Sequence, residues 1–220
     1  MAQVQSDKRR LRGDESRRAV LAHAVATATI DGLDGLTIGR LAEASGLSKS
    51  GIATLFGSKE QLQLAAVATA RDIFIERVVT PARERTPRGL ARVCALVSDW
   101  LAYSRERVFP GGCFFAAASV EFDAKPGAVR DAIVTASTEW EDYLTASIDH
   151  AIAGGELPLL EDARQLAFEM VAVLEAANTR SLLHGSFEPY DRAAAAIRAR
   201  LTALGGDPEL VGAIGGPRAS

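Results

Sequence analysis

Residues 37–59 read TIGRLAEASGLSKSGIATLFGSK, and this stretch predicts two short helices joined by a tight turn. Thr37 is a favoured N-cap for a first helix over about residues 37–44, because its hydroxyl can accept a hydrogen bond from a free backbone N–H. The apolar face of that helix recurs at helical spacing in Ile38, Leu41 and Ala42. Gly46 can adopt the left-handed conformation that ends the helix and turns the chain.

A second helix is predicted from Lys49 to Phe56, with Ser48 as its N-cap and with Ile52, Leu55 and Phe56 packing inward. Ser58 begins a third and longer helix, since Ser58 and Gln61 have the spacing of a capping box. An apolar stripe also predicts a helix over about residues 14–31. Together these segments predict a three-helix head that contains a helix-turn-helix.

The chemistry of this head suits DNA. In a helix-turn-helix, the second helix enters the major groove with its N-terminal residues nearest the base edges. Helix N-termini and hydroxyl groups also bind phosphate oxygens, which positions the protein on the duplex. The candidate DNA-binding residues are Thr37, Arg40, Ser48, Lys49, Ser50, Gly51, Thr54 and Lys59. The alternative is an ordinary helical hairpin, which is common in helical proteins.

Charge and composition narrow the class of protein. The net charge is −3, which excludes a uniformly basic nucleic-acid binder. Residues 1–60 carry nine basic and seven acidic side chains, a net charge of +2, so the remaining residues carry −5. A mildly positive head on an acidic body fits DNA contact at one end of the chain.

Membrane, redox and catalytic signatures are missing from the sequence. The longest uncharged stretch, Val108 to Val120, is too short to span a bilayer and is broken by Pro110-Gly111-Gly112, so we expect a cytoplasmic protein without membrane contact. Cys94 and Cys113 lack metal or CxxC spacing and are expected to be buried free thiols. No HExxH, phosphate loop or nucleophile elbow is present, so we expect no enzyme activity, no catalytic or metal-binding residue and no cofactor.

The whole chain predicts an all-α fold, because no alternating segment indicates a strand. A long helix from Lys59 to about Val79, ending before Pro81, would join the head to a larger helical body. The predicted domains are a disordered basic arm over residues 1–13, the head over 14–64, the body over 65–204 and a flexible tail over 205–220. The arm, with Lys8, Arg9, Arg10 and Arg12, would reach phosphates or a minor groove, or would be a solvated tail.

The body holds aromatic residues on several predicted helices. With one polar group, these are the candidate ligand-binding residues: Trp100, Tyr103, Phe114, Phe115, Trp140, Phe168 and Asn178. Converging aromatics with a few polar groups can line a pocket for an apolar ligand. The alternative is plain core packing, which aromatic residues also dominate.

The predicted helix over about residues 161–184 is apolar on almost every side, with a stripe formed by Leu166, Met170, Val173, Ala177 and Ser181. Such a helix must be covered on more than one face. The same helix of a second chain would provide that cover, and small residues nearby, including Ala176 and Ala196, would allow close approach. The alternative is burial within the monomer.

Three segments in the head resemble the DNA-binding signature of the tetracycline-repressor (TetR) family. They are TIGRLA at 37–42, ASGLSK at 44–49 and FGSKEQL at 56–62. The resemblance implies a homodimer that binds a near-palindromic double-stranded DNA operator and responds to a small-molecule effector bound in the body. It implies a transcriptional regulator, with a repressor expected before an activator.

The sequence departs from the family pattern at four positions in the head. Ala53, Thr54 and Leu55 stand where the family usually has aromatic residues and a histidine, so aromatic hydroxyls for phosphate contact are missing. Ala28 stands at a position that is often Phe, which leaves the small core thinner there.

The alternative from another class of protein is an all-α enzyme or small-molecule-binding protein without DNA binding.

Overall fold

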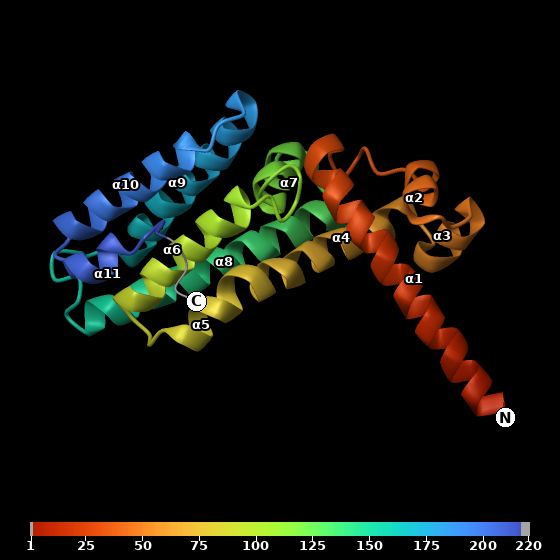
Figure 1. The fold of residues 1–220 in the computed structure, drawn as a ribbon, viewed down its shortest axis with the longest axis horizontal. Coiled ribbons are helices and arrows are strands. Elements are labelled where there is room, and N and C mark those ends of the chain that lie inside the picture. The colour runs from red at the N-terminus through yellow and green to blue at the C-terminus, as the bar shows by residue number, and fades with distance from the viewer. Residues whose placement is uncertain (1, 217–220) are drawn as a thin grey trace. The chain divides into compact units, whose positions relative to one another are not determined.

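The structure, a computed structural model, describes residues 2–216 and gives side chains from Gly13 onward. Every regular element in this range is helical, which confirms the predicted all-α class (Figure 1). In chain order the elements are α1 (Ala2–Asp31), α2 (Ile38–Ser45), α3 (Lys49–Phe56), α4 (Lys59–Phe74), the π-helix η1 (Ile75–Val79), α5 (Thr80–Arg85), α6 (Leu90–Arg105), α7 (Phe114–Phe122), α8 (Ala128–Ala153), α9 (Ala163–His184), α10 (Glu188–Ala203) and α11 (Pro208–Gly212).

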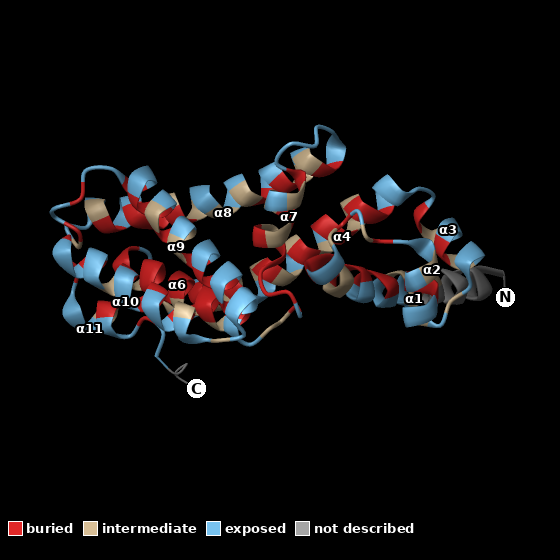
Figure 2. Ribbon diagram, turned by 90° about the horizontal axis from the view of Figure 1, so that it is seen from above, coloured by how far each residue is buried: buried red, intermediate tan, exposed pale blue. Residues whose placement is uncertain are grey.

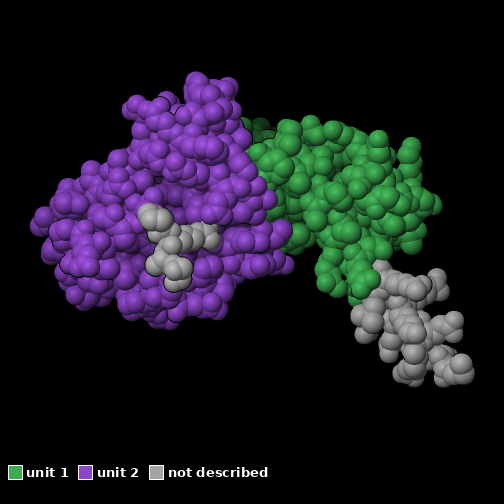
Figure 3. All heavy atoms as spheres, in the orientation of Figure 1, with its two compact units in different colours: residues 1–71, 109–133 green, residues 72–108, 134–220 purple. Residues whose placement is uncertain are grey.

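The chain forms two compact units, which Figure 3 shows in separate colours. The head unit comprises residues 1–71 and 109–133, and the body unit comprises residues 72–108 and 134–220. The chain passes from one unit to the other inside α4, before Phe109 and inside α8. Helix α7 clusters with the N-terminal helices, although the domain division expected from the sequence put every residue after 64 outside the head.

The core of the head unit forms where α1 packs against α2 and α3. The apolar stripe predicted for α1 is buried, and Figure 2 shows buried positions on all three helices. Leu41 of α2 and Ile52 of α3 are at most 1% exposed. The α1–α2 turn adds two side chains to this core, since Leu33 and Leu36 are buried. The apolar spacing in the sequence therefore identified most of the residues that close this small core. Ile38, which was predicted on the same face as Leu41 and Ala42, is instead 36% exposed at the first position of α2.

Helix α1 begins at Ala2, whereas the sequence was expected to be disordered through residue 13. Residues 2–12 are mostly good helix formers without proline, and extending an existing helix needs no new nucleus. The structure describes no side chain before Gly13, so the predicted contacts of Lys8, Arg9, Arg10 and Arg12 lie outside the described residues.

The sequence predicted that the helix starting at Lys59 would end before Pro81, but in the structure it does not end there. It continues through η1 into α5, where Pro81 lies in the first turn. Within η1 the Thr80 N–H donates to the Ile75 carbonyl oxygen, which is the wider i→i−5 pattern of a π-helix. In a regular α-helix the Pro81 ring would clash with the Arg77 carbonyl. The wider turn next to the proline relieves that clash and lets the helix continue.

The body unit is built around α6, most of whose side chains are buried, and α9 and α10 pack side by side (Figures 1 and 2). The tail expected to be flexible from residue 205 is partly folded. Asp207 caps α11 by accepting the Glu209 and Leu210 N–H groups, and Val211 and Ile214 are buried. The prediction of a flexible tail rested on the Gly-rich composition of this segment and overlooked two apolar side chains whose spacing allows both to be buried.

Among the described residues, none of the helices combines the length and apolar character that crossing a bilayer requires. The same residues contain no group of three or more His, Cys, Asp or Glu side chains placed to hold a metal ion.

Candidate functional site

The helix-turn-helix has the caps that its sequence predicts. The Thr37 hydroxyl accepts the Arg40 N–H at 3.3 Å at the start of α2, and the Ser48 hydroxyl accepts the Gly51 N–H at 3.0 Å at the start of α3. Gly46 ends α2 in the left-handed conformation, with φ of 69°. These local interactions hold α2 and α3 at a sharp turn because they satisfy backbone groups that the helices leave free.

Helix α3 presents a polar edge to solvent. Ser48, Lys49, Ser50 and Thr54 are exposed, while Ile52 and Phe56 on the other side of the helix are buried. The Ser48 and Ser50 hydroxyls lie 3.1 Å apart at the first turn. Such an edge can approach a groove lined with phosphates closely, since most of its side chains are short and one is cationic.

Lys49 is the cation of this edge that is most available to a ligand. It makes no hydrogen bond or ion pair with another described residue, and a Cβ at Gly39 would lie 3.6 Å from the Lys49 Cε. The Lys49 side chain therefore passes over α2 next to a residue that offers no steric obstruction. Gly39 and Gly51 both keep the surface around it low.

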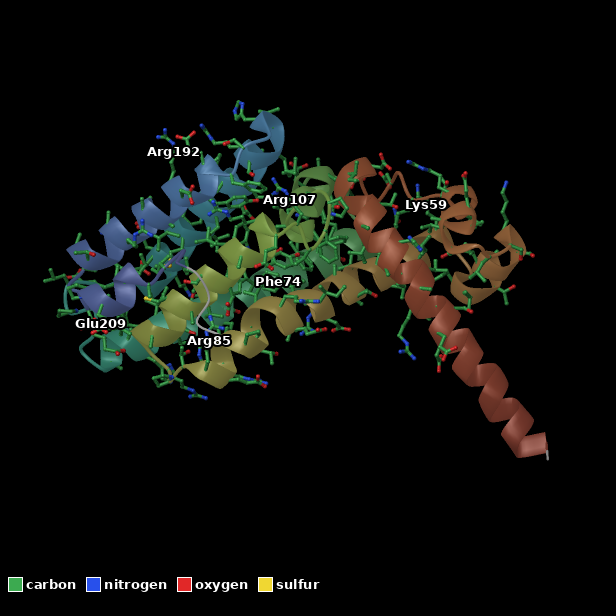
Figure 4. All side chains as sticks on the ribbon, viewed as in Figure 1. Lys59, Phe74, Arg85, Arg107, Arg192 and Glu209 are labelled. Carbon is green, nitrogen blue, oxygen red and sulfur yellow. The ribbon has the colours of Figure 1, made fainter. Side chains whose placement is uncertain are left out.

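Three other cations of the head have partners within the protein. The Arg40 guanidinium pairs with Asp31 at 2.8 Å, and the Lys59 Nζ donates to the Asp34 carbonyl oxygen at 2.6 Å (Figure 4). The Arg17 Nη1 donates to the Leu55 carbonyl oxygen at 2.8 Å, at the C-terminal end of α3. Arg40 and Lys59 are more than half exposed, so they keep donors for a phosphate, whereas Arg17 mainly joins α1 to α3.

The predicted ligand-binding aromatics do not form one set. Trp100, Tyr103 and Trp140 lie in the body unit, where the Phe74 ring joins Tyr103 at 5.6 Å and Trp140 at 5.1 Å between centroids. Sequence reasoning missed Phe74 as the centre of this group, although its position four residues after Ala70 on a long apolar face was a usable signal.

Three of the remaining candidates lie elsewhere. Phe114 and Phe115 belong to the head unit, with ring centroids 5.3 Å apart. Phe168 is 65% exposed on α9, so it lines no interior of a single chain. Its exposure arises because α9 buries the opposite face, which carries Leu166 and Met170.

Asn178 belongs to a buried polar cluster that joins α6, α9 and α10. The Ser104 hydroxyl donates to the Asn178 Oδ1 at 2.9 Å and lies 2.8 Å from the Tyr190 hydroxyl. The Arg107 Nη1 donates to the Tyr190 hydroxyl at 2.9 Å, and its Nη2 donates to the Ser181 hydroxyl at 2.8 Å (Figure 4). Asn178 is therefore engaged in a structural network, which sequence spacing did not reveal.

Asp99 is a second polar residue that sequence reasoning missed. Its side chain is 1% exposed, and its Oδ1 accepts a hydrogen bond from the Arg85 Nη2 at 2.8 Å. The other carboxylate oxygen, Oδ2, is buried without a hydrogen-bond partner among the described residues. Asp99 lies four residues before Tyr103, which puts both on one face of α6. The signal was a lone acidic residue inside the apolar run that includes Trp100.

Helices α9 and α10 leave a groove and an apolar face uncovered within the single chain. Phe168, Ala172, Ala176 and Leu183 recur along the exposed side of α9. The adjoining groove is lined by Val173, Ala176, Ala177, Arg180, His184, Glu188, Pro189, Arg192, Ala193 and Ala196. The stripe predicted for contact with a second chain differs, because its members Leu166, Met170 and Ser181 are buried inside the monomer.

Comparison with known proteins identifies this arrangement. Residues 89–197 match the family model described as "Tetracyclin repressor-like, C-terminal domain". A TetR transcriptional regulator from Chloroflexus aurantiacus J-10-FL is 27% identical and superposes with a TM-score of 0.76, over 88% of this chain and 94% of its own. The chain belongs to the tetracycline-repressor family. These two matches therefore confirm the family resemblance that was predicted from the helix-turn-helix.

Other members of the TetR family share the fold. A regulator from Agrobacterium tumefaciens is 20% identical with a TM-score of 0.77, over 87% of this chain and 98% of its own. AibR, in complex with isovaleryl coenzyme A and operator DNA, is 20% identical with a TM-score of 0.63, over 74% of this chain and 86% of its own. No curated protein matches the chain.

Proposed function

We propose that this TetR-family protein is a ligand-responsive repressor that binds a near-palindromic operator as a homodimer. The observation that carries the proposal is the exposed edge of α3. Ser48, Lys49 and Ser50 stand at the start of a helix whose other face is anchored by Ile52 and Phe56. A rigid helix with short polar groups at its N-terminus is the geometry that major-groove recognition requires.

Lys49 would supply the main phosphate contact of this edge, because it has no competing partner among the described residues. Thr54, whose hydroxyl donates to the Ser50 carbonyl oxygen at 2.8 Å, lies one turn further along the exposed side of α3. Lys59 and Arg40 would add contacts at the flanks, at the cost of weakening their links to Asp34 and Asp31. AibR, with the same fold, is seen with operator DNA.

The apolar face of α9 supports a dimer. Phe168 and Leu183 are 65% and 76% exposed, and Ala172 and Ala176 lie between them on the same side. Large apolar side chains exposed on one side of a helix often mark a surface that contacts another protein. A second copy of α9 and α10 would cover the row, and small residues allow the helices to approach closely. Two-fold symmetry would then present two α3 helices to two half-sites.

An effector would bind in the body unit near the ring group of Phe74, Tyr103 and Trp140. Asp99 keeps one buried oxygen that has no hydrogen-bond partner in the described part of the chain, and it offers an acceptor on the same face of α6 as Tyr103. Effector binding changes DNA affinity only if the effector prefers one conformation of the protein over another. The continuous helix α4–η1–α5 carries Phe74 as well as the capping end at Lys59, so it would transmit that preference.

The DNA-binding proposal is tested by selecting bound sequences from random double-stranded DNA, then measuring affinity for the selected operator at several salt concentrations. Replacing Lys49 by Ala in both subunits should weaken binding and lower the salt slope by about 2, because each lost phosphate contact lowers it by about 0.9. Adding Lys59→Ala should lower both further. The exposed body residue Arg83 provides the control, since Arg83→Ala should leave the slope unchanged. An unchanged operator affinity and slope in the double variant would show that the head does not bind DNA as proposed.

The dimer is tested by sedimentation of Phe168→Glu. A charge at the N-terminal end of the α9 face, in place of its largest apolar side chain, should shift the protein to monomer and abolish two-fold operator binding. Leu159→Glu is the matched control, because Leu159 is also exposed, at 68%, but precedes α9. A Phe168→Glu protein that stays dimeric at low micromolar concentration would place the interface elsewhere.

A further inference from the structure

The turn between α1 and α2 is held by a carboxylate from a distant part of the chain. The Leu33 N–H donates to the Glu121 Oε2 at 2.7 Å, and the Asp34 N–H donates to the Oε1 at 2.9 Å. Both oxygens of one side chain are thus occupied by two successive backbone donors. Glu121 lies in the last turn of α7, and its side chain is 20% exposed.

Gly32 makes this approach feasible. It has φ of 78°, and a Cβ there would lie 2.8 Å from the Glu121 carboxylate. A side chain at this position would be both strained and in the way of the carboxylate. The turn is therefore shaped to receive Glu121 and not only to reverse the chain.

Lys125 adds an ion pair on the α7 side of the turn. Its Nζ lies 2.8 Å from the Asp34 Oδ2 and 3.8 Å from the Glu121 Oε1. The hydrogen bond from Lys125 lowers the pKa of Asp34, and the same bond raises the pKa of Lys125. The three charges hold one another in place, although both Asp34 and Lys125 are about half exposed.

Helix α4 fixes the opposite side of the same turn. The buried Gln63 donates from its Nε2 to the Leu33 carbonyl oxygen at 3.0 Å and to the Asp34 Oδ1 at 3.1 Å. The Lys59 Nζ donates to the Asp34 carbonyl oxygen. The turn is therefore gripped between α4 and α7, the second of which lies outside the three-helix head predicted from sequence.

The loop before α7 is attached to α1 as well. The Gly111 N–H donates to the Thr29 hydroxyl at 3.0 Å, and both residues are buried. A Cβ at Gly111 would lie 1.9 Å from the Thr29 carbonyl oxygen. The segment that contains α7 thus contacts the end of α1 before the helix and the α1–α2 turn after it, which explains why it clusters with the head unit.

We propose that Glu121 is a positioning residue for DNA binding. It does not touch DNA itself. Its carboxylate fixes two of the six residues, 32–37, that connect α1 to α2, and so fixes the angle at which α3 is presented. This inference rests on the proposed DNA binding and adds a residue, 73 positions after Ser48, on which operator recognition depends.

The physical reason is the ordering of the turn. Without Glu121, the Leu33 and Asp34 N–H groups lose their acceptor, and the turn samples other conformations. Recognition of a specific operator must then order it again, and the conformational entropy lost in doing so weakens binding. A cost of about 1.4 kcal/mol weakens binding about ten-fold. Non-specific binding, which depends on charge more than on the angle of α3, should change little.

The test compares Glu121→Gln with Asp123→Asn, which removes the same charge two residues away in an exposed position. Affinities for the selected operator and for scrambled DNA are measured, together with amide hydrogen exchange and the thermal midpoint. Glu121→Gln should weaken operator binding about ten-fold, leave binding to scrambled DNA unchanged and speed exchange at Leu33 and Asp34. Asp123→Asn should match the wild type in all four measurements.

Glu121→Asp provides a second variant that keeps the charge but shortens the side chain, so that the carboxylate can no longer reach the two backbone donors at once. It should also weaken operator binding, leave binding to scrambled DNA unchanged and speed exchange at Leu33 and Asp34. If the Gln variant does not fold, the Asp variant takes its place in the test. Operator binding by both variants equal to that of the wild type would overturn the positioning role and leave DNA binding intact. A wild-type protein that selects no DNA sequence would overturn both proposals.

Discussion

Removing one oxygen from the buried polar cluster should destabilise the body unit measurably. Tyr190→Phe keeps the ring, which is 1% exposed, and deletes only the hydroxyl. That hydroxyl accepts a hydrogen bond from the Arg107 Nη1 at 2.9 Å and lies 2.8 Å from the Ser104 hydroxyl. The change therefore tests the hydrogen bonds without creating a large cavity.

The magnitude follows from which partners are left without an alternative. The Ser104 hydroxyl keeps its bond to the Asn178 Oδ1 at 2.9 Å, so its loss is small. The Arg107 Nη1 keeps only the Ser104 carbonyl oxygen, at 3.4 Å. Because a hydrogen bond to a charged group contributes about 1.5–3 kcal/mol, we expect the free energy of unfolding to fall by about 2 kcal/mol. For a chain of this size the melting temperature should fall by about 5 °C.

Urea unfolding at one fixed protein concentration measures this loss. Tyr143→Phe is a matched control, because the Tyr143 hydroxyl also accepts from an arginine, the Arg92 Nη1 at 2.9 Å. Arg92 has further bonds to the Thr86 hydroxyl and to two backbone carbonyl oxygens, and Tyr143 is partly exposed. The control should lose less than about 1 kcal/mol. Equal losses in the two variants, or no loss for Tyr190→Phe, would refute the reasoning from burial and alternatives.

Three further outcomes can be measured. Lys125 lowers the pKa of Asp34 below its ordinary value of 3.8, so their pairing stabilises the fold above that pH and is lost as the pH falls through the lowered pKa. When stability to urea is measured against pH, Lys125→Met should therefore show a smaller loss of stability at acid pH than the wild type. Burial raises the pKa of the Cys94 thiol to about 12, so iodoacetamide at mildly alkaline pH should modify Cys94 only after unfolding, as mass spectrometry would show. Gly111→Ala should lower the free energy of unfolding by about 3 kcal/mol, because the new Cβ would overlap a backbone carbonyl of α1. Gly13→Ala, which has open space around it, should not destabilise the protein, and thermal melts of the two variants would show the difference.

The parts of the fold that could be predicted from sequence are those that depend on neighbours in the chain. Thr37, Gly46 and Ser48 were identified as caps, because a cap acts within three or four residues. The buried stripe of α1 followed from spacing alone for the same reason. The helix-turn-helix and the family were therefore within reach before any coordinates.

The features that were missed depend on distant partners. Glu121 accepts from backbone groups 88 and 87 positions earlier, and no periodic pattern marks such a bond. Asn178 was taken for a ligand contact because its partner Ser104 lies 74 positions away. Phe168 was placed in the interior because an aromatic residue on an apolar helix shows its orientation only once the buried face is known. The DNA contacts and the effector site stay predictions.

The π-helix η1 has a consequence for how the chain tolerates change. It contains one residue more than an α-helix of the same rise would need between Phe74 and Thr80. Deleting a single exposed residue there, such as Arg77, would leave the helices on either side in register, but ordinary α-helical winding would bring the Pro81 ring against the carbonyl four residues before it. Substitutions in this region should thus be accepted far more readily than insertions or deletions, and natural length variation should fall in the loops instead.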